Sequence, residues 1–290
     1  MPSTRELRRR IKSVKNISQI TRAMEMVAAS RMRRAQQAAL AGRPYSEKLD
    51  DVIAHLGARL GTIDVDVTHP LLQQRPVRRV GIILITADKG LCGSMNSNVI
   101  RRSTRFMLEE AAAPDGFALV TVGRKGRDFM VRYGRPVIAE FVNYGDRPSP
   151  DYVVPIARVI TDEYASGRID AVHLIYSEFV NTLVQKPIVV PLLPLQPAEV
   201  SGPQLEYIYE PSPAVVLSQL VPRYVEARIY QAMLESVASE QSAKLVAMRN
   251  ATQNAKEMVS ELTLSYNKLR QANITRELTE IAGGAAAITG

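Results

Sequence analysis

The spacing of apolar residues and helix breakers predicts a long helix at the C-terminal end of the chain. Neither glycine nor proline occurs from Arg223 to Ala282, whereas Pro222 precedes this stretch and Gly283 and Gly284 follow it. At a rise of about 1.5 Å per residue, such a helix would be roughly 90 Å long, too long for a compact domain. Its apolar seam has the three-and-four spacing of coiled coils, which predicts a partner helix. The seam comprises Leu234, Ala238, Gln241, Leu245, Met248, Thr252, Ala255, Val259, Leu262, Tyr266, Leu269 and Asn273.

A second helix is predicted at the N-terminal end, where residues Ser3 to Ala41 also contain no glycine or proline. Ser3 and Glu6 have the spacing of a capping box at its start. The apolar pattern resumes beyond Gly42 and Pro44, so the helix is either kinked or restarted there. The positions expected to face the partner helix are Leu7, Ile11, Val14, Ile17, Ile20, Met24 and Val27, followed by Leu49, Val52, Ile53 and Leu56.

Between these helices, short apolar runs alternate with amphipathic stretches. The runs predict strands at 80–86, 117–122, 137–142 and 171–176, and the stretches predict helices near 95–112, 125–132 and 151–166. This alternation is typical of a mostly parallel sheet covered by helices on both faces. The segment 186–197 contains four prolines and belongs at a sheet edge or outside the sheet. A last short strand is predicted at 207–209.

The sequence therefore predicts an α/β protein with an inserted domain. Residues 1–57 and 211–290 are expected to form one long antiparallel coiled coil, and residues 76–210 a Rossmann-like, mostly parallel α/β domain.

The positive charge of the chain is concentrated in its first helix. Residues 1–40 hold ten basic and two acidic side chains, an excess equal to the formal net charge of +8 of the whole chain. A basic helix can bind nucleic acid, an anionic membrane or an acidic protein surface, or it can simply be a solvated face. Residues 1–40 contain no aromatic side chain, which counts against stacking on nucleic acid.

Cysteine usage and hydropathy restrict the class of protein further. Cys92 is the single cysteine, so no internal disulfide can form. No apolar signal segment begins the chain, and no run approaches the roughly 18 apolar residues of a membrane span. We therefore expect a chain that is soluble by itself and has no direct membrane span.

The turn after the first predicted strand, residues 87–98, is the natural place to look for a nucleotide. Gly90 and Gly93 allow a tight turn, and Ser94 or Asn96 could cap the next helix. Neither GxGxxG nor GxxxxGK[ST] occurs there, so a turn that needs glycine for its geometry is the better interpretation. The GRKG sequence at 123–126 is a weaker candidate still.

No catalytic or metal-binding pattern is evident. His55, His69 and His173 are scattered over a predicted helix, a linker and a strand, and no HxxH or CxxC spacing occurs. His173 alternates with apolar neighbours, which favours a packed strand residue over a general base. We expect no catalytic residue, no cofactor and no metal.

Several long sequence strings resemble the gamma subunit of F-type ATP synthases. They are residues 10–36, which include ITRAMEMVAAS, residues 87–93 (ADKGLCG), residues 207–211 (YIYEP), residues 240–258 and residues 266–287. The resemblance covers essentially the whole chain, and the strings follow the order of the family. This chain lacks the cysteine pair of the chloroplast members, because Cys92 is its single cysteine, so we do not expect their redox switch.

The resemblance implies a non-catalytic central rotor. The terminal helices would form a shaft inside a ring of alpha and beta subunits, and the inserted domain would bind the epsilon subunit and the c-ring of the membrane sector. The chain would transmit torque during ATP synthesis or hydrolysis and influence ATPase activity and proton flow. It would be a peripheral part of the complex at the cytoplasmic face of the bacterial plasma membrane.

The resemblance also suggests residues that contact partners. The family's polar contacts with the surrounding ring correspond here to Arg270 and Gln271, with Thr275 and Glu280 in the same motif. Further candidates are Met24, Arg9, Arg33, Arg34 and Lys89, for which a solvated or packed role is an equal alternative. The uncharged run after Glu280 suits a tip that turns in an apolar sleeve. The alternatives to a rotor are a basic coiled-coil nucleic-acid-binding protein and a nucleotide-dependent enzyme.

Overall fold

The structure is a computed structural model that describes residues 3–60, 69–110, 113–195, 210 and 212–289. The chain divides into two compact units, each described here by itself. The first combines residues 1–27 with residues 245–290, and the second comprises residues 28–244. Two long helices contribute to both units: α1 spans Thr4–Leu60 and α5 spans Pro213–Thr289.

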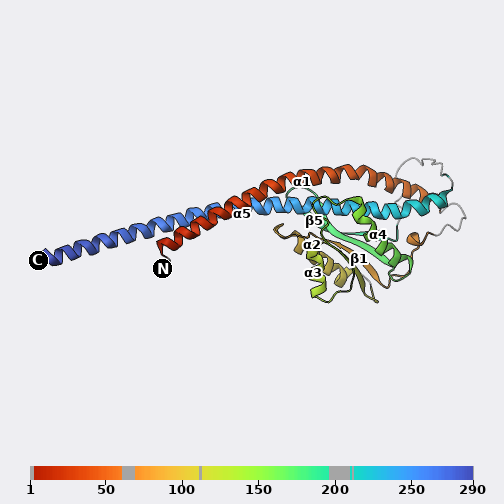
Figure 1. The fold of residues 1–290 in the computed structure, drawn as a ribbon. Coiled ribbons are helices and arrows are strands. Elements are labelled where there is room, and N and C mark those ends of the chain that lie inside the picture. The colour runs from red at the N-terminus through yellow and green to blue at the C-terminus, as the bar shows by residue number, and fades with distance from the viewer. Residues whose placement is uncertain (1–2, 61–68, 111–112, 196–209, 211, 290) are drawn as a thin grey trace. The chain divides into compact units, whose positions relative to one another are not determined.

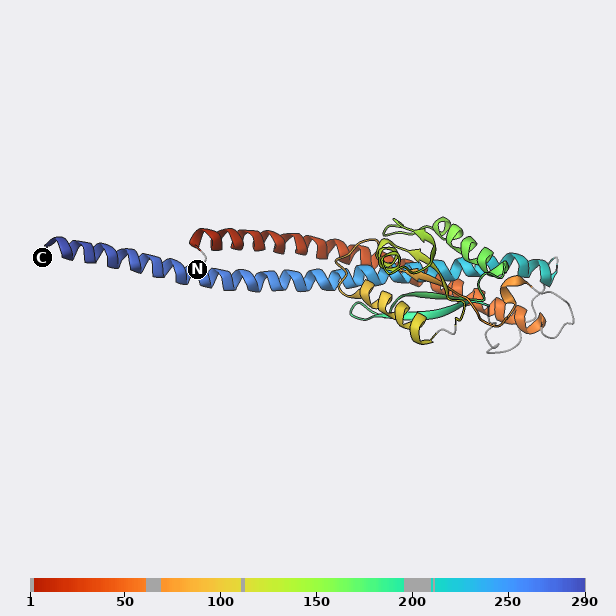
Figure 2. The same cartoon turned by 90° about the horizontal axis from the view of Figure 1, so that it is seen from below.

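In the first unit, α1 and α5 run antiparallel side by side (Figures 1 and 2). Contacts between Arg8 and Tyr266 and between Thr21 and Thr252 fix this direction, because the numbers rise on one helix as they fall on the other. The predicted seam of α5 is confirmed. Leu245, Met248, Thr252 and Ala255 are buried, and Val259, Leu262, Tyr266, Leu269 and Asn273 are half-buried among exposed neighbours.

The predicted seam of α1 is partly wrong. Ile17, Ile20 and Val27 are 49%, 59% and 51% exposed, while Leu7 is buried and Ile11 and Val14 are half-buried as expected. Met24 is also half-buried, but from Val14 onward the interface continues through half-buried Ser18, buried Thr21 and half-buried Glu25. Consecutive residues of a helix differ by about 100° in direction, so a stripe displaced by one residue points away from the partner. Small hydroxyl side chains, together with the Thr21–Thr252 hydrogen bond, occupy the interface.

Both long helices continue through residues that were expected to break them. α1 includes Pro44, so the N-terminal helix is not restarted there, and α5 begins nine residues before Pro222 and includes Gly283 and Gly284. Proline removes one backbone donor, but packing can outweigh that loss. Leu217, Val221, Val225 and Ile229, which surround Pro222 on α5, are all buried in the core of the second unit.

The sheet of the second unit has the order β3-β2-β1-β4-β5 (Figure 1). Its strands are β1 (Val80–Ile85), β2 (Phe117–Val122), β3 (Val137–Phe141), β4 (Ala171–Phe179) and β5 (Gln185–Leu193). The first four are parallel, and β5 pairs antiparallel with β4 at one edge. The proline-containing segment is therefore an edge strand, as predicted. The strand predicted at 207–209 lies outside the described residues.

Helices cover both faces of this sheet. They are α2 (Met95–Arg105), continued by the π-helix η2 (Phe106–Glu110), α3 (Arg124–Arg132) and α4 (Pro150–Ala165); a 3₁₀ turn, η1, spans Pro70–Leu72. One core packs Ile82 and Leu84 of β1 against α2, η2 and α3. The other packs Ile83 and Ile85 against α4 and against α5 residues such as Val225 and Met233. Alternate residues of β1 thus serve opposite cores, as expected for a buried parallel strand.

Candidate functional site

The turn after β1 is held by an asparagine rather than by a cap on α2. The Asn96 side chain accepts a hydrogen bond from the Ala87 amide at 3.0 Å and donates to the Lys89 carbonyl at 3.4 Å. Ser94 occupies the N-cap position of α2 but makes no capping hydrogen bond, so the predicted side-chain cap is wrong. Leu91 and Gly93 have φ angles of 65° and 58°, which explains the glycine at 93.

The crevice at the carboxyl ends of β1 and β4 is covered by α5. The strand order reverses between these two strands, where ligands usually bind in open α/β sheets. Here Ser239 donates to the Ser177 carbonyl and Ser242 donates to the Thr182 carbonyl, both at 2.9 Å. Beside them, Ala243 packs against Cys92 and Met95. The chain's own helix therefore covers the place where ligands usually bind, which supports the interpretation of 87–98 as a structural turn.

Burial shifts the pKa values of several titratable groups in the second unit. Burial raises the pKa of the Cys92 thiol, and burial also raises the pKa of the Glu240 carboxyl against the opposing effect of Lys244, 2.7 Å away. Burial lowers the pKa of His173, whose ring lies 4.8 Å from that of Phe106. His173 is therefore a packed strand residue, as predicted. His69 accepts a hydrogen bond from the Leu71 amide at the start of η1.

The described residues include no group of three or more histidine, cysteine, aspartate or glutamate side chains that could hold a metal ion. Within the same ranges, no helix is long and apolar enough to cross a membrane.

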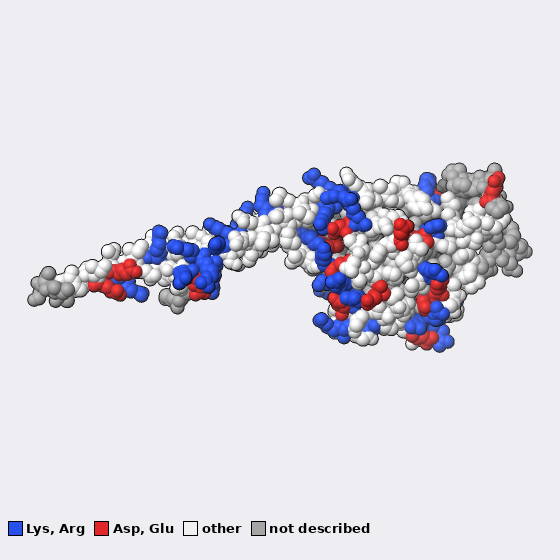
Figure 3. All heavy atoms as spheres, viewed as in Figure 1, with Lys and Arg blue, Asp and Glu red and all other residues white. Residues whose placement is uncertain are grey.

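The predicted contact residues fall into two groups. Arg270, Gln271, Thr275 and Glu280 on α5, together with Arg9 and Met24 on α1, belong to the first unit, and Arg33, Arg34 and Lys89 belong to the second. All are exposed except Met24, which is half-buried. Within the described ranges, Arg9, Arg33, Lys89, Arg270 and Glu280 have no ion-pair partner. Figure 3 shows basic side chains gathered over the N-terminal part of α1. These charged groups are available to a partner.

Among the described residues, no helix lies beside the C-terminal end of α5. α1 begins at Thr4, and near its start Arg8 donates a hydrogen bond to the Tyr266 hydroxyl of α5 at 2.7 Å. Residues 274–285 of α5 are all exposed, and α5 continues past the start of α1 in both views (Figures 1 and 2). Ile274, Leu278 and Ile281 are 48%, 62% and 69% exposed at helical spacing. This apolar stripe on a single helix indicates a surface that a partner covers.

A polar cluster of Arg31, Asp146 and Gln241 in the second unit was not predicted from the sequence. Arg31 pairs with Asp146, and Gln241 donates to the same carboxylate at 3.1 Å. Arg31 appeared only as one of many basic residues, and the loop that carries Asp146 and Arg147 has no motif. The sequence feature that could have indicated this cluster is Gln241, because it is a polar residue in an otherwise apolar seam.

Comparisons with known proteins agree with this arrangement. The model of a protein family described as ATP synthase matches residues 3–288. The ATP synthase gamma chain of Dehalococcoides mccartyi strain 195 is 53% identical over 289 residues, covering 99% of this chain and 100% of that relative. The gamma chain of Roseiflexus castenholzii is 52% identical over 295 residues, covering 99% of each. A chain of the Tetrahymena thermophila mitochondrial ATP synthase central stalk and c-ring is 27% identical, with a TM-score of 0.60 over 80% of this chain and 99% of that one.

The fold pairs the two terminal helices and carries an inserted sheet domain, in which α5 covers the crevice at the end of the sheet. The match across the chain places it in ATP synthase. The chain belongs to the ATP synthase gamma chain family. Nothing in these comparisons supports a nucleic-acid-binding protein.

Proposed function

We propose that this chain is the central rotor of a proton-translocating F-type ATP synthase. It transmits torque between the c-ring of the membrane sector and the catalytic ring of alpha and beta subunits, in ATP synthesis or hydrolysis. Through this coupling it influences ATPase activity and proton flow. The observation that carries the proposal is the exposed end of α5, residues 274–285, with its apolar stripe of Ile274, Leu278 and Ile281.

The chemistry of this end suits a surface that turns against its partner. Apolar contacts are non-directional, so they hold an axis without favouring one angle. No charged side chain follows Glu280, and a charged contact that had to break at each step would leave a desolvated charge unpaired. Arg270 and Gln271 lie just before the stripe, and we assign them angle-dependent polar contacts with the ring. Thr275, Glu280, Arg9 and Met24 of the same unit are further contact candidates.

The second unit is the proposed connection to the membrane sector. We assign binding of epsilon and of the c-ring to the inserted domain, residues 76–210, and the shaft to residues 1–57 and 211–290. Arg33, Arg34 and Lys89 are exposed cations that suit acidic surfaces of the catalytic ring. The gamma chains of Dehalococcoides mccartyi and Roseiflexus castenholzii come from bacteria, which supports a peripheral position at the cytoplasmic face of the plasma membrane.

The test is isolation of the native complex from cells that carry variants of the α5 stripe. Changing Ile274 and Leu278 to glutamate places two carboxylates in the proposed sleeve, and we expect loss of ATP-driven proton pumping or of assembly with alpha and beta. The matched control changes Ala272 and Thr279 to glutamate, on the same exposed helix but outside the stripe. Isolation of the unaltered chain with nucleic acid and without ATPase subunits would contradict the proposal, as would equal pumping by the two variants.

A further inference from the structure

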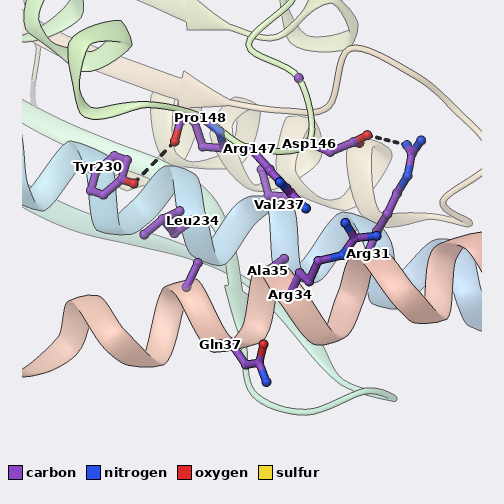
Figure 4. A pocket seen from close by; sticks show the side chains of 12 residues that line it. Arg31, Arg34, Ala35, Gln37, Asp146, Arg147, Pro148, Tyr230, Leu234 and Val237 are labelled. Carbon is purple, nitrogen blue, oxygen red and sulfur yellow. Dashed lines mark hydrogen bonds and ion pairs between the residues drawn. The ribbon is translucent and has the colours of Figure 1, made fainter.

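A hollow in the second unit is bounded by α1, by the loop of residues 145–148 and by α5. Its volume is about 770 Å³, within the roughly 300–1,000 Å³ typical of small-molecule sites. Ala35, Leu234 and Val237 form a buried apolar floor. Tyr230 forms one wall, and its hydroxyl donates to the Pro148 carbonyl at 3.4 Å (Figure 4).

The rim of the hollow carries more positive than negative charge. Arg31, Arg34 and Arg147 line it together with one carboxylate, that of Asp146. Arg31 forms an ion pair with the Asp146 carboxylate, which also accepts a hydrogen bond from Gln241 at 3.1 Å. Within the described part of the chain, Arg34 donates to the carbonyl and hydroxyl of Ser30 on its own helix, at 3.3 and 3.0 Å, and to no other residue. Arg147 has no ion pair within the described ranges, so two guanidinium groups border the hollow without a carboxylate.

Figure 4 shows Arg34 reaching the hollow from α1 and Arg147 reaching it from the facing loop. Guanidinium groups bind phosphate through two parallel hydrogen bonds each, and a phosphate monoester carries close to two negative charges at neutral pH. A free phosphate ion would leave the apolar floor unused. We propose that this hollow binds a small organic phosphate, with its apolar body on Tyr230, Leu234 and Val237 and its phosphate between Arg34 and Arg147.

The test uses the full-length chain and 1-naphthyl phosphate as the probe, with binding followed by titration calorimetry. We expect saturable binding of one molecule per chain, at least tenfold tighter than that of 1-naphthol or inorganic phosphate. Changing Arg34 and Arg147 to glutamine should weaken binding at least tenfold. Changing Arg33 and Arg132 to glutamine removes the same charge from exposed positions outside the hollow and should alter affinity less than twofold.

A second pair of variants keeps the test decisive if the arginine variant fails to fold. Ala38→Glu adds a carboxylate at the rim, whereas Ala41→Glu adds one to an exposed position of the same helix that does not line the hollow. Only Ala38→Glu should abolish binding. Equal loss in both members of a pair, or binding that never saturates, would identify general attraction of anions and overturn the proposal, as would absence of binding to the unaltered chain.

Discussion

Thr21 of α1 and Thr252 of α5 share a hydrogen bond of 2.8 Å between their hydroxyl oxygens, and both side chains are buried between the two helices. Thr252 also donates to the Met248 carbonyl at 2.8 Å and Thr21 to the Ser18 carbonyl at 3.1 Å, so either hydroxyl can be the donor across the pair. A buried polar pair of this kind favours one axial register, because sliding either helix would leave a hydroxyl unsatisfied.

The threonine pair predicts a non-additive effect of mutation. Thr21→Val or Thr252→Val alone should lower the free energy of unfolding by about 1–3 kcal/mol, because a buried hydroxyl or carbonyl group loses its partner. The double variant should cost less than the sum of the single changes, since both sides of the interface become apolar. Denaturant unfolding of the four proteins measures this coupling. Thr263→Val, at an exposed position of α5, is the control, and strictly additive losses would contradict the pairing.

The corrected seam of α1 predicts that mutations at different apolar positions change the stability of the isolated chain by different amounts. Leu245 is buried at the interface, and Leu245→Ala should cost about 2–5 kcal/mol of unfolding free energy. Ile20 is more than half exposed, so Ile20→Ala should change stability by less than about 0.5 kcal/mol. Chemical denaturation of both variants gives the comparison. If Ile20→Ala lowered the free energy of unfolding more than Leu245→Ala, Ile20 would lie in the interface, as the apolar spacing predicts.

The seams of α5 and α1 show which interface positions the sequence predicts correctly and which it does not. On α5 the apolar spacing and the buried positions coincide, so every predicted seam residue is buried or half-buried. On α1, Ile17 and Ile20 lie one residue before half-buried Ser18 and buried Thr21, whereas the apolar spacing favours the larger apolar side chains. The strands and the edge position of β5 followed from apolar runs and from Pro187 and Pro191. The hollow bordered by Arg34 and Arg147 depends on a loop approaching a helix, which no local pattern encodes.

The environment of Cys92 predicts low chemical reactivity. Burial, followed by the nearby Glu240 carboxylate, raises the pKa of this thiol. At any pH below that raised value, the thiolate fraction is smaller than for a free cysteine, and the thiolate is the nucleophile. Alkylation by iodoacetamide at pH 8 should therefore be at least tenfold slower in the native chain than in denaturant. A chain carrying Cys92→Ser and Ser94→Cys offers an exposed thiol as the control. Equal native rates for Cys92 and the introduced cysteine would show that Cys92 is not protected.

The two parts of the α5 end should differ in their effect on coupling. Deleting residues 281–290 removes part of an apolar contact, and we expect lower stability of the complex but substantial remaining rotation and ATP hydrolysis. Changing Arg270 and Gln271 together to alanine removes directional contacts and should impair coupling or assembly more sharply. ATP-driven proton pumping by membranes at matched enzyme content compares them. Abolished pumping in the truncation with normal pumping in the double variant would reverse this assignment.

Observation of rotation tests the central claim most directly. A cysteine introduced at the exposed position Tyr133, at the end of α3, can carry a gold bead, because buried Cys92 should not compete for the label. With the alpha and beta subunits fixed to a surface, we predict that ATP hydrolysis turns the bead in one direction, and that the bead stops when ATP is exhausted. A complex that hydrolyses ATP at the normal rate while the bead on this chain stays still would contradict the account.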